Sequence, residues 1–177
     1  YTDLPFLVRL TERDGAYVVG KNLTAADLGD DGEGAAWKTV LMDAATGEAA
    51  VPNGSMGFRH TDSGVGRWNL DLEGVTPALS VRDAAGESGT AEVLLPAFEA
   101  PDGTGNVLRR GVPTRVVNGH LVTTVFDLML AQYGVGRDGL PGTWPTGYDD
   151  PEPYTPAWQE EITGVPAAMA ERIGREF

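Results

Sequence analysis

The stretch Val116-Val117-Asn118-Gly119-His120-Leu121-Val122 is the clearest local indication of fold in this sequence. Its Asn118-Gly119 pair is the favoured two-residue turn of a β-hairpin, because both residues accept the positive φ angles that the turn requires. The β-branched and apolar residues on either side are typical of paired strands. The stretch therefore predicts two antiparallel strands.

A helix is predicted directly after this hairpin, and a long loop after the helix. Thr123 or Thr124 can cap the helix, and Asp127 falls in its first turn, where the helix dipole favours an acid. The body is expected to contain Val125, Leu128, Met129 and Gln132-Tyr133, with its end at Gly134. Residues 134–153 are rich in Gly, Pro and Asp and predict a loop. Loops of this length are usually functional or packed against a partner.

Two further helices are predicted near the C-terminus. Thr155-Pro156 is a strong start signal, with Thr as the cap and Pro in the first turn, and Gly164 ends this helix after about Thr163. Val165-Pro166 opens the last helix. Its apolar side chains recur every four residues, which is typical of an amphipathic helix: they are Val165, Met169, Ile173 and Phe177.

Short strands separated by Gly-, Pro- and Asp-rich turns are predicted before residue 116. Thr24 is expected to cap a short helix over Ala25–Leu28. The Arg13-Asp14-Gly15 turn joins the first two strands, and Ala45-Thr46-Gly47 joins the next two. The expected strand segments are Phe6–Leu10, Ala16–Val19, Trp37–Met42, Ala49–Val51, Arg67–Leu72, Val81, Ala91–Leu95 and Val107–Arg110.

Together these elements predict an α+β fold. Residues 1–122 are expected to form an irregular β-rich section of short strands and hairpins. Residues 123–177 are expected to form a helical section that contains the 134–153 loop and begins a further α/β section.

Composition excludes several functions. The 177 residues carry a formal net charge of −13, which repels nucleic acids and anionic lipid headgroups. No stretch approaches the ~20 apolar residues of a membrane span, so we expect a soluble chain without direct membrane insertion. The sequence has no cysteine, which removes thiolate zinc sites, iron–sulfur ligands and cysteine nucleophiles.

The motifs that suggest a ligand site have simpler structural explanations. Gly134-Val135-Gly136-Arg137-Asp138-Gly139 matches a dinucleotide-binding pattern, but it follows a predicted helix where that motif needs a strand. Two acidic runs offer oxygen ligands for calcium but lack the spacing of a calcium loop. These runs are Asp30, Asp31, Glu33 and Asp149, Asp150, Glu152. We assign no metal to them.

Two functions of other classes stay open at this point. Asp/Gly loops together with Trp37, Trp68, Trp144 and Trp158 suggest a stand-alone acidic β-module that binds calcium or carbohydrate. A small hydrolase would use His60 or His120, although Ser55 and Ser63 near His60 form no recognised nucleophile motif.

Both ends of the sequence suggest a piece of a longer protein. Tyr1-Thr2-Asp3-Leu4-Pro5 has neither an initiator Met nor a signal-peptide pattern. The last helix reaches Phe177 without a Gly or Pro stop.

Several ordered stretches resemble the alpha subunits of respiratory membrane-bound nitrate reductases, which are molybdopterin oxidoreductases. The stretches are Tyr1–Val8, Trp37–Val40, Pro52–Arg59, Trp68–Leu70, Leu121–Leu128, Tyr148–Asp150, Tyr154–Trp158 and Ile162–Val165. The segment from Ile162 to Phe177 resembles many molybdopterin oxidoreductases. The segments 52–59 and 121–133 resemble the nitrate reductase branch, whose relatives act on selenate, chlorate or ethylbenzene.

The resemblance implies a parent enzyme that reduces nitrate to nitrite at a molybdenum carried by two molybdopterin guanine dinucleotides, with a 4Fe-4S cluster nearby. It implies an iron–sulfur beta subunit, a haem-containing membrane gamma subunit that passes electrons from quinol, and a membrane-associated parent on the cytoplasmic face. In that family the cluster ligands and the molybdenum aspartate precede this segment. We therefore expect a structural segment that is inactive alone, with no catalytic or metal-binding residue and with undefined cofactor contacts.

Overall fold

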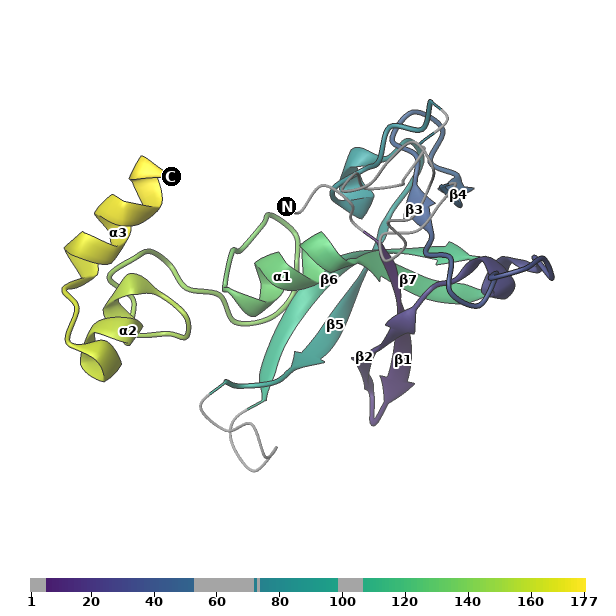
Figure 1. The fold of residues 1–177 in the computed structure, drawn as a ribbon. Coiled ribbons are helices and arrows are strands. Elements are labelled where there is room, and N and C mark those ends of the chain that lie inside the picture. Colours follow the sequence, from purple (N-terminus) through teal and green to yellow (C-terminus); the bar gives the residue numbers. More distant parts are fainter. Residues whose placement is uncertain (1–5, 53–71, 73, 99–106) are drawn as a thin grey trace.

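The computed structural model describes residues 6–52, 72, 74–98 and 107–177 (Figure 1). Within these residues five strands close into one barrel in the order β1-β2-β5-β6-β7. They are β1 (Leu7–Arg13), β2 (Ala16–Asn22), β5 (Gly89–Leu95), β6 (Leu108–Val117) and β7 (His120–Thr124). Neighbouring strands are antiparallel except β2 and β5, which are parallel. Each of the five strands therefore pairs with two neighbours.

Both predicted tight turns of the barrel are confirmed. Asn118 and Gly119 have φ angles of 45° and 78° between β6 and β7, where Val117 pairs with His120. Asp14 and Gly15 have φ angles of 51° and 80° between β1 and β2. Positive φ at both central residues gives the turn the twist of the strands that it joins.

A second, two-stranded sheet pairs β3 (Leu41–Met42) with β4 (Ala49–Ala50). The predicted strand Trp37–Met42 is therefore too long. The N–H groups of Trp37 and Lys38 donate to the carbonyl oxygen of Gly34 in a turn, so they cannot join a ladder. The Trp37 side chain is 88% exposed.

The two 3-10 helices among the described residues are η1 (Ala25–Leu28) and η2 (Val81–Asp83). η1 confirms the predicted helix after Thr24. The strand predicted at Val81 is wrong, because Ser80 caps a helical turn there and accepts a hydrogen bond from the Arg82 N–H. The strand predicted at 67–72 lies outside the described residues except for Leu72.

The buried apolar side chains form two clusters that meet at β1. Leu7 belongs to one cluster and Val8 and Leu10 to the other, because successive side chains of a strand point to opposite faces. The first cluster also contains Leu23, Val40, Met42, Ala78, Val81, Ala84 and Val122. The second also contains Ala91, Val93, Leu95, Val112, Leu128 and Ala131.

Three helices complete the described α+β fold: α1 (Val125–Gln132), α2 (Pro156–Thr163) and α3 (Ala167–Glu176). Thr124 caps α1 and Thr155 caps α2, as predicted, and Gly164 ends α2 with a φ of 71°. α1 lies against the barrel, whereas α2 and α3 lie beyond it, away from the strands (Figure 1). Among the described residues no helix has the length and apolar character to cross a membrane.

Candidate functional site

A buried cation, Arg110, lies in the middle of β6. Its side chain is only 1% exposed. Nη1 donates to the carbonyl oxygens of Ala131 (2.8 Å) and Gln132 (3.0 Å), at the C-terminal end of α1. The negative end of the helix dipole lies there, so the cation is favourably placed.

The same guanidinium holds the 134–153 loop. Nε donates to the Thr143 carbonyl oxygen at 3.2 Å and Nη2 to that of Pro153 at 2.6 Å. The ring of Trp144 lies 5.5 Å from the guanidinium carbon, within cation–π range. Burial lowers the pKa of Arg110 from its ordinary value, while the negative charge of Glu152 raises it. An arginine nevertheless stays charged, and its hydrogen bonds to these carbonyl oxygens connect β6 with α1 and the loop.

Close backbone contact secures the loop against β6. The Gly111 N–H donates to the Pro141 carbonyl oxygen at 2.6 Å, and Gly142 forms an isolated bridge with Arg110. Gly142 has a φ of 110°, and a Cβ there would lie 2.5 Å from the Arg109 carbonyl oxygen. Glycine is therefore required at this crossing.

A second group that connects separate elements is the carboxylate of Asp127, which is fully buried. It accepts hydrogen bonds from Ser80 Oγ (2.7 Å), the Val81 N–H (2.9 Å) and Thr124 Oγ1 (2.9 Å). Arg137 Nη1 donates to it at 2.6 Å, from a side chain that is 20% exposed. Asp127 thus joins η2, α1 and the 134–153 loop.

Four aromatic rings connect the barrel end to α2. The rings of Phe98 and Tyr154 have centroids 4.9 Å apart, and those of Tyr154 and Trp158 are 4.8 Å apart and perpendicular. Tyr133, at the end of α1, lies 6.3 Å from Phe98 and 6.4 Å from Tyr154. The Phe98 N–H donates to the Tyr154 hydroxyl at 2.6 Å. A cavity of about 260 Å³ lies beside them, lined in part by Tyr133, Tyr148 and Tyr154.

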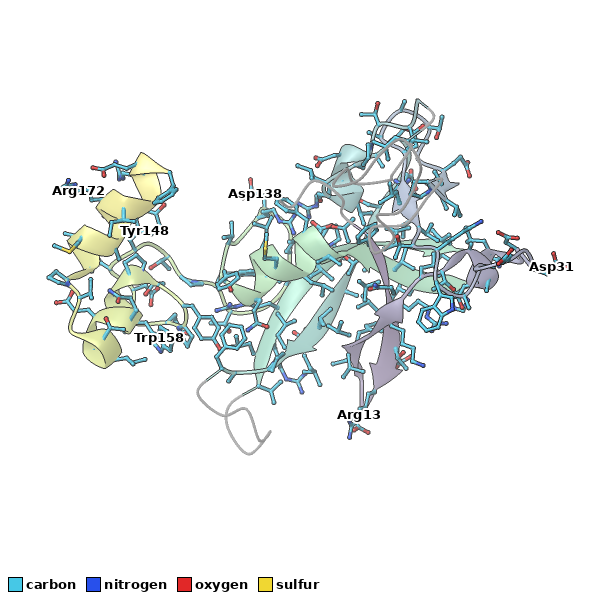
Figure 2. All side chains as sticks on the ribbon, in the orientation of Figure 1. Arg13, Asp31, Asp138, Tyr148, Trp158 and Arg172 are labelled. Carbon is cyan, nitrogen blue, oxygen red and sulfur yellow. The ribbon has the colours of Figure 1, made fainter. Side chains whose placement is uncertain are left out.

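The acidic runs considered as calcium ligands lie in turns, the first of them exposed and the second partly buried at Asp150 and Glu152. Asp30 Oδ1 accepts a hydrogen bond from the Gly32 N–H, and Figure 2 shows Asp31 at the tip of its loop. Asp150 accepts from the Thr146 N–H, the Glu152 N–H and the Thr146 hydroxyl, which lower the pKa of its carboxyl. Within the described ranges no three His, Asp or Glu side chains are grouped to hold a metal ion.

The remaining candidates do not come together with these groups. Gly134 follows α1 with a φ of 77°, so the three-glycine pattern begins as a helix end. His120 is half-buried at the start of β7 and pairs with Val117. Residues 53–71 lie outside the described residues, and His60, Ser55, Ser63 and Trp68 lie there.

Sequence analysis missed Arg110 and Arg137 as organising residues. Leu108, Arg110 and Val112 follow one another at every second position of β6, so their side chains lie on the same face of the strand. The side chains of Leu108 and Val112 contact a core cluster. A charge at an inward position of a strand is a usable signal, because buried charge must find partners. Arg137 lies in a loop and its sequence carries no comparable signal.

Comparison with known proteins places these contacts beside a known group of enzymes. No protein-family model matches the chain. All of the chain aligns with the nitrate reductase alpha subunit of Mycobacterium tuberculosis at 57% identity. It aligns equally completely, at 42% identity in each case, with the nitrate reductase alpha chain of Bacillus subtilis and the respiratory nitrate reductase 1 alpha chain of Escherichia coli. The chain spans about 15% of the length of the first two relatives and 16% of the third.

The barrel, with its carbonyl-bound arginine and its buried carboxylate, aligns with only a small part of relatives that are several times longer. Over its whole length the chain is similar to one part of nitrate reductase alpha subunits. The alternative of a calcium- or carbohydrate-binding module is not better supported.

Proposed function

We propose that this chain is a structural segment of the catalytic alpha subunit of a respiratory nitrate reductase. The observation that carries the proposal is similarity over the whole chain to alpha subunits of three distant bacteria. The parent enzyme reduces nitrate to nitrite and is an oxidoreductase of the molybdopterin type. We infer that the segment has an irregular β-rich section at residues 1–122 and a helical section at residues 123–177, as part of the larger molybdopterin oxidoreductase fold.

The cofactors of the parent belong to other parts of the subunit. A molybdenum carried by two molybdopterin guanine dinucleotides supplies oxygen-atom transfer, and a 4Fe-4S cluster supplies electrons. Clusters of that type are held by cysteine thiolates, and this chain contains no cysteine. Asp127 is fully engaged by four donors within the chain. The chain therefore contributes shape and support, and it is inactive by itself.

The 134–153 loop faces the rest of the subunit. Arg110 and Arg137 hold its inner side, while most of its other side chains are exposed, Val135 at 47% and Tyr148 at 58%. The parent works with an iron–sulfur beta subunit and a haem-containing gamma subunit, at the cytoplasmic face of the membrane.

A chimera tests this proposal directly. This chain would replace the aligned segment of the Mycobacterium tuberculosis alpha subunit, which is 57% identical. We expect the chimera to bind molybdenum and to reduce nitrate with reduced viologen, whereas the 177-residue chain alone should do neither. The matched control carries Arg110→Met in the same chimera and should lose both properties. A chimera that folds without molybdenum would overturn the proposal.

A further inference from the structure

The turn of the β6–β7 hairpin contains an asparagine followed by a glycine, Asn118-Gly119. Asparagine is a thermolabile residue because its side-chain amide can be lost. A following glycine has no side chain to shield its backbone nitrogen from that amide. Both residues are exposed, and a Cβ added to Gly119 would meet no atom within 4 Å. The pair is therefore open to a spontaneous modification, deamidation.

Deamidation at this pair needs only water. The backbone nitrogen of Gly119 loses its proton to solvent, attacks Cγ of Asn118 and forms a new N–C bond, while the side-chain nitrogen leaves as ammonia. The five-membered succinimide that results adds one water molecule. Opening of one or the other of its two C–N bonds then leaves aspartate or isoaspartate. Overall one water is consumed, one ammonium ion is released and the chain gains one negative charge.

The folded chain opposes the first step of this reaction. Asn118 Nδ2, the nitrogen that must leave, donates to the Asp27 carbonyl oxygen at 2.6 Å. The φ angles of 45° and 78° at Asn118 and Gly119 define the turn, and the pairing of Val117 with His120 fixes both of its ends. The Asn118 side chain must leave its acceptor and rotate toward the Gly119 nitrogen before the ring can close. Attack therefore requires local opening of the turn.

The acceptor of this hydrogen bond is itself held in place. Asp27 Oδ2 accepts hydrogen bonds from the Thr24 N–H and the Thr24 hydroxyl, each at 2.9 Å, and Asp27 Oδ1 accepts one from Arg9 Nη1 at 2.9 Å. These contacts connect η1 with β1 and fix the Asp27 carbonyl beside the hairpin. The Asn118 amide thus joins two elements across 91 positions of sequence. A carboxylate at position 118 cannot donate, and two facing acceptors repel each other.

We propose that Asn118-Gly119 is a deamidation site, that the hydrogen bond to Asp27 protects it in the folded chain, and that its reaction separates η1 from the β6–β7 hairpin. This inference is independent of the proposed function. Aspartate cannot restore the lost hydrogen bond. Isoaspartate also lengthens the main chain of a two-residue turn by one carbon atom, where Val117 pairs with His120. The separation is therefore irreversible.

Peptide mapping by mass spectrometry measures the reaction, because deamidation changes the mass of the peptide that contains residue 118. The chain is incubated at mildly alkaline pH, folded in buffer and unfolded in urea. We expect Asn118 to react at least about tenfold more slowly in the folded chain, because attack needs local opening. In urea Asn53-Gly54, the other Asn-Gly pair of the sequence, should react at the rate of Asn118 and provides the reference.

A matched pair of variants tests the contact with η1. Asp27→Ala removes the carboxylate that orders η1 but keeps the main-chain carbonyl, so it should speed deamidation of Asn118 in the folded chain at least about threefold. Asp31→Ala makes the same change of charge at an exposed position and should leave the rate unchanged. Circular dichroism checks that both variants fold. If Asp27→Ala does not fold, the ratio of folded to unfolded rates in the unchanged chain still decides.

Hydrogen exchange tests the consequence of the reaction. Asn118→Asp has the sequence of the aspartate product and should speed exchange of the η1 amides at least about threefold. Ser88→Asp adds the same charge at an exposed position and should not. Equal deamidation rates of Asn118 in the folded and unfolded chains would overturn the proposed protection. Equal effects of the two alanine variants would overturn the role of Asp27, and unchanged η1 exchange in Asn118→Asp would overturn the separation.

Discussion

The Nη1 atom of Arg110 lies 2.8 Å from the carbonyl oxygen of Ala131, so a buried strand cation satisfies the C-terminal end of α1. Its other nitrogens reach carbonyl oxygens at Thr143 and Pro153. One side chain thus sets the distance between the barrel, the helix and the loop that leads to α2.

Arg110→Met should lower the free energy of unfolding of the chain by about 3 kcal/mol or more, because several buried carbonyl oxygens lose their donor. Arg109→Met is the matched control. Arg109 is 57% exposed and pairs with Glu92 at 2.9 Å, and exposed ion pairs contribute about 1 kcal/mol or less. Urea unfolding of both variants measures the difference. Equal losses of unfolding free energy in the two variants would show that Arg110 does not connect the barrel, the helix and the loop.

Asp127→Asn should destabilise the chain by about 3–5 kcal/mol, the usual cost of breaking a buried pair from one side. The change leaves the Arg137 cation without its carboxylate and replaces one accepting oxygen with an NH2 group that faces hydrogen-bond donors. Asp138→Asn, at an exposed position of the same loop, should change little. A double-mutant cycle with Arg137→Met should show coupling between the two residues. If the losses of unfolding free energy in the two single variants simply add in the double variant, the buried pair of Asp127 and Arg137 is contradicted.

Gly111→Ala should destabilise the chain by about 1–3 kcal/mol, as overpacking does. A Cβ at this position would lie 2.7 Å from the Pro141 nitrogen, so the loop must move off β6. Gly147→Ala is the control, because a Cβ there meets no atom within 4 Å. Thermal unfolding, combined with proteolysis of the 134–153 loop, measures both effects. Unchanged cleavage in Gly111→Ala would argue against docking of this loop.

Asp150 should stabilise the chain at neutral pH and lose that effect in acid. Hydrogen bonds from the Thr146 N–H, the Glu152 N–H and the Thr146 hydroxyl lower its pKa in the folded chain. A lowered folded pKa contributes stability above the unfolded value of about 4, and the contribution disappears as pH falls through the folded pKa. Asp150→Asn should therefore reduce the thermal midpoint at pH 7 and have a smaller effect near pH 2. Asp149→Asn, its exposed neighbour, serves as the control.

Local signals in the sequence predict the elements well and their assembly poorly. Asn118-Gly119 and Thr155-Pro156 each act within a few residues, so their turn and helix start were predictable. The closed barrel depends on the parallel pairing of Tyr17 with Val93, which no local pattern encodes. Val81 looked like a strand residue, and the capping hydroxyl of Ser80 made it helical.

The candidate site was harder to predict than the fold. The acidic runs drew attention by composition, but their carboxylates bond to neighbouring backbone. The groups that organise the molecule are single side chains whose partners are distant in sequence. Ser80 and Asp127 meet across 47 positions, and Arg110 and Pro153 across 43.

The pairing of Leu7 with Thr124, where β1 lies beside β7, brings the first and last strands of the barrel together. The chain therefore enters and leaves the barrel on adjacent strands, which lie about 4.8 Å apart. Such a closed excursion can be lengthened, shortened or exchanged during evolution without shifting the flanking scaffold. The barrel is thus a closed excursion of the chain whose two ends are neighbours.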